Sequence, residues 1–277
     1  MRCCYVIPYL EASESLKATI ATLLRSDDDI VVVAVHDTPK RYKDARRPTG
    51  ERNRALSDRL HVLHDGLHKG YTRSINVGAK LALERFVPEL LCLLNDDVLL
   101  PNNKIPALAA LPEDAGLVGI VSNRAGYQSL QYCFDGAGDF LYPEYGLEAA
   151  IEKHRHMAER IGAKYVPVPL VHGFGFYIRS EVFLELGLLD EESFPTGYGS
   201  DFDLSLRAEA AGHRNYVWTG DFVWHIGSAT TGREQRRIKA IGADFMLKRK
   251  HGSTYVDAQF KTRKRMDRHM HNYLELA

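Results

Sequence analysis

The sequence lacks several features that would point directly to a class of protein. Four cysteines occur among its 277 residues, at positions 3, 4, 92 and 133, and none form a Cys-x-x-Cys pair. We therefore expect no disulfide framework and interpret them as reduced, buried thiols. No apolar run reaches the roughly 18 residues of a membrane span, and the N-terminal apolar stretch meets Pro8 too early for a secretory signal. The chain is therefore expected to be cytoplasmic.

An excess of charge of one sign is also missing. The 36 Lys and Arg residues equal the 36 Asp and Glu residues, which argues against a protein that binds nucleic acid with its whole surface. No G-x-G-x-x-G follows the first apolar strand and no G-x-x-x-x-G-K-[ST] occurs, so a dinucleotide oxidoreductase and a P-loop enzyme are both disfavoured. At 45% hydrophobic and 26% charged residues, the composition is that of a folded globular protein.

The first half of the chain alternates strand and helix patterns. The expected strands are residues 3–7, 30–35, 61–64 and 90–95, and the expected helices are 13–25, capped by Ser13, and 71–86. This alternation is typical of crossover units, so we predict an α/β fold with a mostly parallel sheet flanked by helices on both faces. The polar segment 37–58 is expected to be a surface loop or a short helix.

The second half follows a different pattern. We expect strands at 116–123, 127–134, 140–142 and 171–178, a hairpin turn at 135–138, and helices at 147–162, 180–187 and 200–212. Ser200 is the expected cap of the last helix and Gly212 its stop. Residues 233–277 contain twelve Lys and Arg against five Asp and Glu, and are expected to form a basic helical tail.

Two adjacent acids give the sharpest chemical signal. Asp96 and Asp97 follow the apolar strand LLCLLN, where open α/β sheets bind their ligands. Carboxylate oxygens suit Mg²⁺ or Mn²⁺, which take one or two carboxylates together with phosphate oxygens and water. The same residues would also make a good turn, so both interpretations stay open.

A second signal lies about a hundred residues later. Asp201 and Asp203 fall in the first turn of an expected helix, where the helix dipole keeps a carboxylate ionised and able to act as a base. Helix capping alone also predicts acids there. His225 follows the apolar run FVW and is either a structural residue or a metal ligand.

In their order along the chain, these signals resemble the inverting GT-A glycosyltransferases, the large second family of nucleotide-sugar-dependent enzymes. The resemblance covers roughly residues 3–252. It is carried by YVIPYLEASESL near the N-terminus, GYTRSINVGAKLA at 70–82, GFGFYIRSEVFLELGLLDEESF at 173–194 and FMLKRKHG at 245–252. It implies a GT-A, Rossmann-like fold with a donor-binding half at 1–122, an acceptor-binding half at 123–232 and the basic helical tail at 233–277.

The resemblance also implies roles for individual residues. Pro8 and Tyr9 correspond to the segment that holds the nucleotide base, and Asp37 to the acid that contacts base or ribose, with His36 as the alternative. The other implied roles are donor binding by Arg73, Asn76, Asn95 and Asp96, metal binding by Asp97 and His225, and catalysis by Asp201 as the base.

Some positions depart from the family pattern. Asn95 stands where the first Asp of Asp-x-Asp is usual, and Ser200 replaces the Glu of the family's Glu-Asp pair. The Ser200 departure leaves Asp203 as an alternative base. Two residues two positions apart on a helix cannot both face one acceptor hydroxyl, and we favour Asp201.

The implied activity is inverting transfer of a sugar from a nucleoside-diphosphate sugar to an acceptor hydroxyl, in polysaccharide or glycoconjugate biosynthesis of the bacterial type, with Mn²⁺ or Mg²⁺. A non-catalytic nucleotide-sugar or carbohydrate binding module of the same fold is the alternative. The basic tail would contact the inner membrane face, or it is a solvated helix or an oligomer contact. Nucleic acid is not an expected partner, because aromatic residues are not interleaved with the basic ones.

Overall fold

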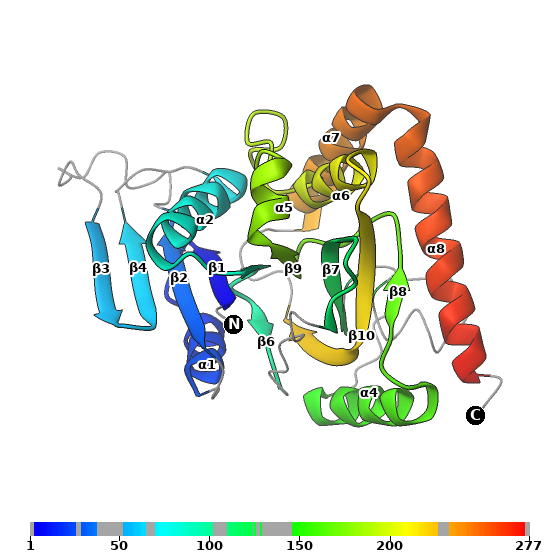
Figure 1. Cartoon of the computed structure of the whole chain (residues 1–277), viewed down its shortest axis with the longest axis horizontal. Helices are drawn as coiled ribbons and strands as arrows, with labels where there is room; N and C mark the ends of the chain where they lie inside the picture. The colour runs from blue at the N-terminus through cyan, green and yellow to red at the C-terminus, as the bar shows by residue number, and fades with distance from the viewer. Residues whose placement is uncertain are drawn as a thin grey trace.

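The fold is a large central sheet with helices packed on both faces (Figure 1). The computed structural model describes residues 3–25, 29–37, 52–64, 70–101, 110–123, 125, 128, 146–226 and 233–274. The predicted strands 127–134 and 140–142 and the turn at 135–138 lie, apart from Gln128, outside these ranges, as does Cys133. The other three cysteines are buried in strands of the sheet.

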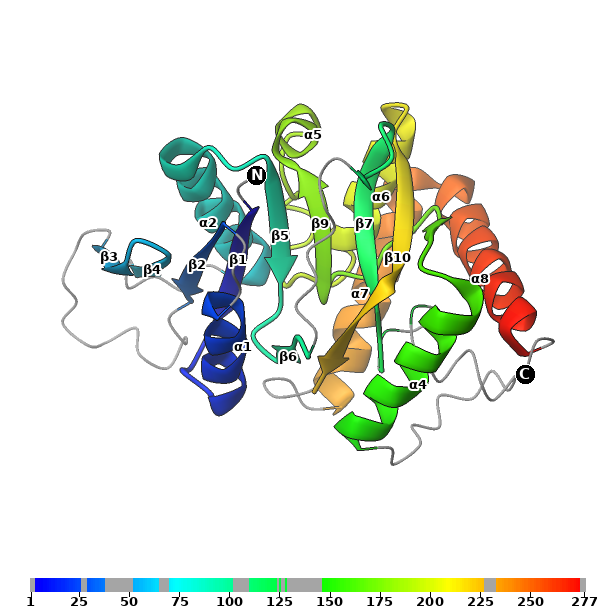
Figure 2. The ribbon, with the colours of Figure 1, turned by 60° about the horizontal axis from the view of Figure 1, so that its bottom comes forward.

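Ten strands form the sheet, in the order β3-β4-β2-β1-β5-β9-β7-β10-β6, with β8 paired to β10. They are β1 (Cys3–Tyr9), β2 (Ile30–His36), β3 (Arg52–Ser57), β4 (Leu60–His64), β5 (Leu90–Leu94), β6 (Val98–Leu99), β7 (Ala115–Ser122), β8 (Tyr165–Pro167), β9 (Gly175–Arg179) and β10 (Arg214–His225). Neighbours are parallel from β4 through β5, whereas β9 lies antiparallel between β5 and β7. β10 is parallel to β7. The C-terminal ends of the parallel strands therefore all lie at the same end of the sheet (Figure 2), namely those of β1, β2, β4, β5, β7 and β10.

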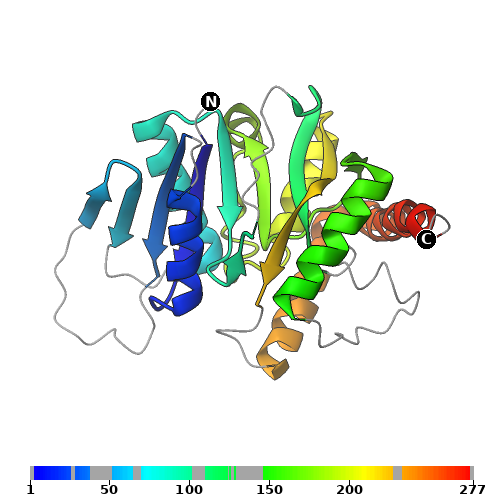
Figure 3. The ribbon, with the colours of Figure 1, turned by 90° about the horizontal axis from the view of Figure 1, so that it is seen from below.

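The helices are α1 (Glu14–Leu24), α2 (Tyr71–Phe86), α4 (Leu147–Ile161), α5 (Ser180–Glu185), α6 (Ser200–Ala210), α7 (Arg233–His251) and α8 (Ser253–Leu274). α1 packs Leu16 and Leu23 into the core on one face of the sheet. α2, α5 and α6 pack on the other face, and Figure 3 shows α1 and α2 on opposite sides. The sheet is therefore covered on both faces, as the alternating pattern predicts.

The periodic segments of the sequence form the expected elements, with ends that mostly shift by a residue or two; the strand predicted at 171–178 begins four residues later, at Gly175. Ser13 caps α1 by accepting a hydrogen bond from the Leu16 amide at 3.1 Å. The expectation for 37–58 is wrong in part, because residues 52–57 form strand β3, which pairs antiparallel with β4 at the edge of the sheet. The segment RNRALS has no apolar alternation that would reveal it.

The two C-terminal helices share a hydrophobic cluster with the preceding residues. Leu247 of α7 and Tyr255 of α8 are buried with Leu170, Phe194 and Leu206. The basic segment is helical, as predicted, and its separation from residues 1–232 as a unit stays a prediction. Across the described ranges, the structure contains no helix with the length and hydrophobicity needed to cross a bilayer.

Candidate functional site

An acid and a histidine meet where β5 and β10 end. The turn after β5 carries Asp96 and Asp97, and the short strand β6 that follows pairs with the end of β10, with Val98 opposite His225. The Ile226 amide donates to the Asp97 carbonyl at 2.8 Å. This pairing places Asp97 Oδ1 3.2 Å from His225 Nε2, across 128 residues of sequence.

Two neighbours fix the position of His225. Asn123, directly after β7, accepts a hydrogen bond from the His225 amide at 2.6 Å and donates to the His225 carbonyl at 3.1 Å. The imidazole stacks on the ring of Phe174, with centroids 5.4 Å apart. The ring is therefore held in one orientation, with Nε2 directed toward Asp97.

The donor atoms at this point suit a divalent cation. Asp97 Oδ1 is buried and has no hydrogen-bond partner, although the His225 ring is close. Burial, together with the nearby Asp97 charge, raises the pKa of Asp96 to about 6. A buried, unsatisfied carboxylate oxygen beside a second acid and an imidazole is a good ligand set for Mn²⁺ or Mg²⁺.

The protein would supply only part of such a coordination sphere. No group of three or more His, Cys, Asp or Glu in the described part of the chain is arranged to hold a metal by itself. Asp97 and His225 would provide two ligands, and ions such as Mg²⁺ commonly complete their shell with substrate phosphates and water. The residues present fit a metal that binds together with a diphosphate.

Asp201 contacts the same Gly173–Phe174 segment. Its carboxylate accepts a hydrogen bond from the Gly173 amide at 2.7 Å, and burial raises its pKa to about 6. A Cβ at position 173 would come within 2.9 Å of the Asp201 side chain, so this close approach requires glycine.

The prediction that Ser200 caps α6 is wrong. The cap position is Gly199, which adopts a left-handed conformation with φ of 85° and makes no side-chain cap. Ser200 is already inside the helix, and its hydroxyl donates back to the Gly197 carbonyl at 2.7 Å. The glycine turn sets the start of the helix and presents Asp201 in its first turn.

Tyr71, the first residue of α2, links the two sides of the site. Its hydroxyl donates to Asn95 Oδ1 at 2.8 Å and lies 3.3 Å from the Gly173 carbonyl. Burial raises its pKa, and the charges of Asp201, Asp96 and Asp97 add to that increase. The phenol is therefore a permanent hydrogen-bond donor that lies close to all three acids.

These contacts form a closed ring around one region. Asp97 contacts His225, His225 stacks on Phe174, and Gly173 binds Asp201. Tyr71 joins Gly173 to Asn95, two residues before Asp97. The structure thus brings Asp97, Asp201 and His225 together, as the sequence predicts, although it does not test their roles.

Asp203 has different surroundings. It is fully buried and its carboxylate is bound by three cationic or cation-forming groups: Arg207 Nε at 2.9 Å, Lys250 Nζ at 2.6 Å and His251 Nε2 at 2.8 Å. A fully buried carboxylate whose two oxygens are both bound by side chains of the protein is not accessible to a substrate hydroxyl. Asp203 therefore connects α6 to α7.

The predicted base-binding residues lie at the ends of β1 and β2. Pro8 and Tyr9 close β1, with the Tyr9 ring 5.1 Å from the ring of His36. Asp37 is buried after β2 and its Oδ2 accepts a hydrogen bond from the Gly70 amide at 3.1 Å, at the start of α2. His36 Nδ1 instead lies 2.6 Å from His64 Nδ1. These residues lie at the same end of the parallel strands as the ring of contacts, and their roles stay predictions.

The three remaining residues that are predicted to bind the donor have different surroundings. Asn95 belongs to the ring, whereas Arg73 is exposed on α2. Asn76 is buried and makes three hydrogen bonds to residues 189–191 through both ends of its amide. These bonds hold the turn after α5 against α2, and the predicted role of Asn76 in donor binding stays a prediction.

Sequence reasoning missed Tyr71, Asn123 and His172 as parts of the site. His172 precedes Gly173, and burial, with the nearby His225, lowers its pKa to about 4, so the ring is neutral at pH 7. All three act through partners far away in sequence, and no local spacing marks them. The resemblance of segment 173–194 to the family pattern is the sequence signal that indicates a function near this loop.

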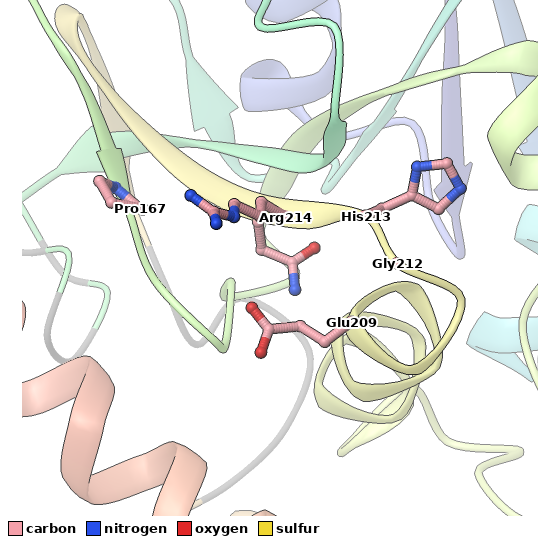
Figure 4. A pocket seen from close by; sticks show the side chains of 6 residues that line it. Pro167, Glu209, Gly212, His213 and Arg214 are labelled. Atoms are coloured by element: carbon pink, nitrogen blue, oxygen red, sulfur yellow. The ribbon is translucent and has the colours of Figure 1, made fainter.

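A pocket of about 370 Å³ lies apart from the site. It is lined by Pro167, Glu209, Gly212, His213, Arg214 and Asn215, as Figure 4 shows. Arg214 begins β10, whereas His225 ends it. The pocket therefore lies at the opposite end of β10 from the site and shares no residue with the ring of contacts.

Comparisons with known proteins agree with this geometry. The family described as "Glycosyltransferase like family 2" matches residues 2–241. Mannosyltransferase PcManGT from Pyrobaculum calidifontis, in complex with GDP-Man and Mn²⁺, is 15% identical with a TM-score of 0.52, over 86% of this chain and 60% of that one. GalNAc-T7 with UDP, GalNAc and Mn²⁺ is 14% identical with a TM-score of 0.55, over 89% of this chain and 47% of that one.

At these identities the two structures establish the fold alone, and this chain spans less than two thirds of the length of either. Among curated protein sequences, no match was found. The family match spans most of the chain and agrees with the GT-A arrangement of the sheet and its edge. The chain therefore belongs to glycosyltransferase family 2.

Proposed function

We propose that this protein is an inverting glycosyltransferase that moves a sugar from a nucleoside-diphosphate sugar to an acceptor hydroxyl with Asp201 as the base. The observation that carries the proposal is the set of contacts that links Asp97 and His225, through Phe174 and Gly173, to Asp201. Two solved structures of the same fold hold GDP-Man or UDP together with Mn²⁺, which supports this class of donor and metal.

The donor end of the reaction belongs to Asp97 and His225. They would hold the divalent ion, which when bound supplies positive charge next to the leaving diphosphate. Asp96, with its pKa near 6, is largely ionised at pH 7 and adds negative charge beside these ligands. Tyr71 keeps Asn95, and with it the turn that carries both acids, in a fixed position.

The acceptor end belongs to Asp201. A base is most effective when its pKa lies near the working pH, and burial moves this carboxylate toward that range. The Gly173 amide occupies one lone pair of Oδ2, which orients the carboxylate. As the acceptor oxygen attacks the anomeric carbon, the bond from that carbon to the diphosphate breaks and Asp201 takes the hydroxyl proton.

A single displacement fits the surroundings of Asp201. A retaining route would need a separate nucleophile beneath the sugar. The other acid in the first turn of α6, Asp203, is bound by Arg207, Lys250 and His251. With one available carboxylate at this end of the site, the predicted product has the inverted anomeric configuration.

Incubation with GDP-mannose, UDP-GalNAc and dTDP-sugars, with and without Mn²⁺, would test the proposal. We expect metal-dependent release of the nucleoside diphosphate for at least one donor, and inversion at the anomeric carbon by NMR of the transfer product. Absence of any nucleotide binding or release would contradict it. Metal-dependent donor binding without transfer to any sugar acceptor would instead identify a binding module.

A further inference from the structure

α7 carries an apolar face that no described part of the protein covers. Ile238, Ile241 and Phe245 are 64%, 61% and 64% exposed. Their spacing of three and four residues places them on one side of the helix. Scattered exposed apolar residues are ordinary, but three large ones aligned on one helix form a patch that indicates an interaction surface.

The opposite side of α7 is the one that packs on the domain. Leu247 is buried in the C-terminal cluster, and Ala243 lies beside Gly199. Lys250 and His251 bind the buried Asp203. The helix is therefore anchored in one rotation about its axis, and the apolar face points outward because of that anchoring.

Exposed arginines flank this apolar face. Of the six Lys and Arg between residues 234 and 251, Lys239 and Lys250 belong to the side of α7 that contacts the domain. Exposed Arg237 and Arg249 lie next to the apolar residues, Arg249 one turn after Phe245, while Lys248 is paired with Asp244. The segment 1–232 carries seven more acids than bases, so the positive charge is concentrated in the C-terminal helices.

The start of α7 lies close to the site. Lys239 of α7 lies over the ring of Tyr198 at 5.7 Å, and Tyr198 is near enough to Asp97 and Arg236 for both charges to act on its pKa. Figures 2 and 3 both show the start of α7 beside the end of β10, where His225 lies. A surface that contacts the start of α7 would therefore lie next to the site.

We infer that this face of α7 docks on an anionic lipid bilayer. A helix with aligned apolar residues and flanking Lys and Arg lies in the interface plane, with its apolar side chains among the lipids and its cations at the headgroups. A second copy of the chain is the less favoured occupant, because two such faces would bring their cations together. Docking rests on the charges and exposure of α7 and does not depend on transferase activity.

Vesicle co-sedimentation tests the inference with the whole chain. We expect binding to phosphatidylcholine vesicles that contain phosphatidylglycerol, little binding to phosphatidylcholine alone, and loss of binding at high salt. The double variant Ile241→Ser and Phe245→Ser should bind at least about tenfold more weakly, and Arg249→Glu should weaken binding mainly at low salt. Leu184→Ser is the matched control, since Leu184 is 57% exposed on α5.

Thermal unfolding would show that the exposed substitutions leave the fold intact. Absence of binding to the anionic vesicles at low salt would overturn the inference, as would equal binding by the double variant and the wild type. Light scattering after size-exclusion chromatography tests whether a second copy of the chain binds this face instead. A wild-type dimer that the double variant converts to a monomer, without vesicle binding by either, would assign the face to a second copy of the chain.

Discussion

Asp201 and Asp203 lie two residues apart on α6 and have opposite environments. Asp201 accepts a hydrogen bond from the Gly173 backbone amide, whereas Asp203 is fully buried and bound by Arg207, Lys250 and His251. The sequence favours Asp201 through its resemblance to the family's Glu-Asp pair, although both acids fit the first turn of a helix. The partners that distinguish them come from α7, about fifty residues further along the chain.

Substitution of these two acids should have separable effects. Asp201→Asn should lower the rate of transfer by about 10²–10⁴-fold with donor binding retained, because a base is lost and little packing changes. Asp203→Asn should instead lower the free energy of unfolding by about 1.5–3 kcal/mol, because Arg207, Lys250 and His251 lose a charged hydrogen-bond acceptor. Product formation and chemical denaturation measure the two effects. A fully active Asp201→Asn would move the base elsewhere.

The pH dependence of transfer follows from the state of Asp201. Only the ionised carboxylate accepts a proton, and the raised pKa lies at about 6. The rate at saturating donor should therefore fall as pH decreases through about 6 and level off above it. A rate that stays constant from pH 7 to pH 5 would contradict the assignment.

The pH dependence of stability that comes from Asp201 should be opposite to that of the rate. Its pKa in the folded chain lies above the unfolded value of about 4. The folded state therefore binds the proton more tightly, and the contribution of Asp201 to the free energy of unfolding increases as pH falls from about 6 to about 4. Denaturation of the wild type and of Asp201→Asn at the two pH values isolates this contribution.

At the scale of elements, the end of β10 depends on its neighbours for position. Asn123 holds the His225 backbone from both sides, and Phe174 holds its ring. The apolar strands and amphipathic helices are predictable, because burial imposes periods of about two and 3.6 residues on the sequence. Asn123 is not predictable, because its contacts are formed by strand pairing 102 residues away.

Removal of the Asn123 amide should therefore weaken metal binding. Asn123→Ala frees the backbone at the end of β10, and loss of such a supporting contact reduces metal affinity by about 10–100-fold. Titration of Mn²⁺ in the presence of a nucleoside diphosphate measures the change. Gln259→Ala, which removes an amide of α8 bonded to Tyr255, is the control. Unchanged Mn²⁺ affinity in Asn123→Ala would show that His225 is held by other contacts.

At the scale of the whole molecule, the C-terminal helices are integrated with the rest of the chain. The sequence predicts a break near residue 232 from the change in charge alone. The structure places Leu247 and Tyr255 in a cluster with Leu170, Phe194 and Leu206, and pairs Lys250 and His251 with Asp203. The charge pattern of the sequence indicates which segments are exposed. The contacts of the C-terminal helices come from tertiary packing, which composition does not predict.

A chain that ends at residue 232 should therefore be destabilised. Asp203 would keep Arg207 alone as a partner, and the apolar cluster would be open to solvent. We expect a free energy of unfolding lower by at least about 3–5 kcal/mol, or aggregation. A truncated chain with the wild-type midpoint of thermal unfolding would instead support residues 1–232 as an independent domain.

The most direct test of the central claim is calorimetric titration of a nucleoside diphosphate with and without Mn²⁺. Wild type, Asp97→Asn, Asp201→Asn and His225→Ala would be compared under one set of conditions. We predict metal-dependent binding in the wild type and in Asp201→Asn, and its loss in Asp97→Asn and His225→Ala. Binding that ignores Mn²⁺, or that survives in Asp97→Asn with wild-type affinity, would contradict the proposed site.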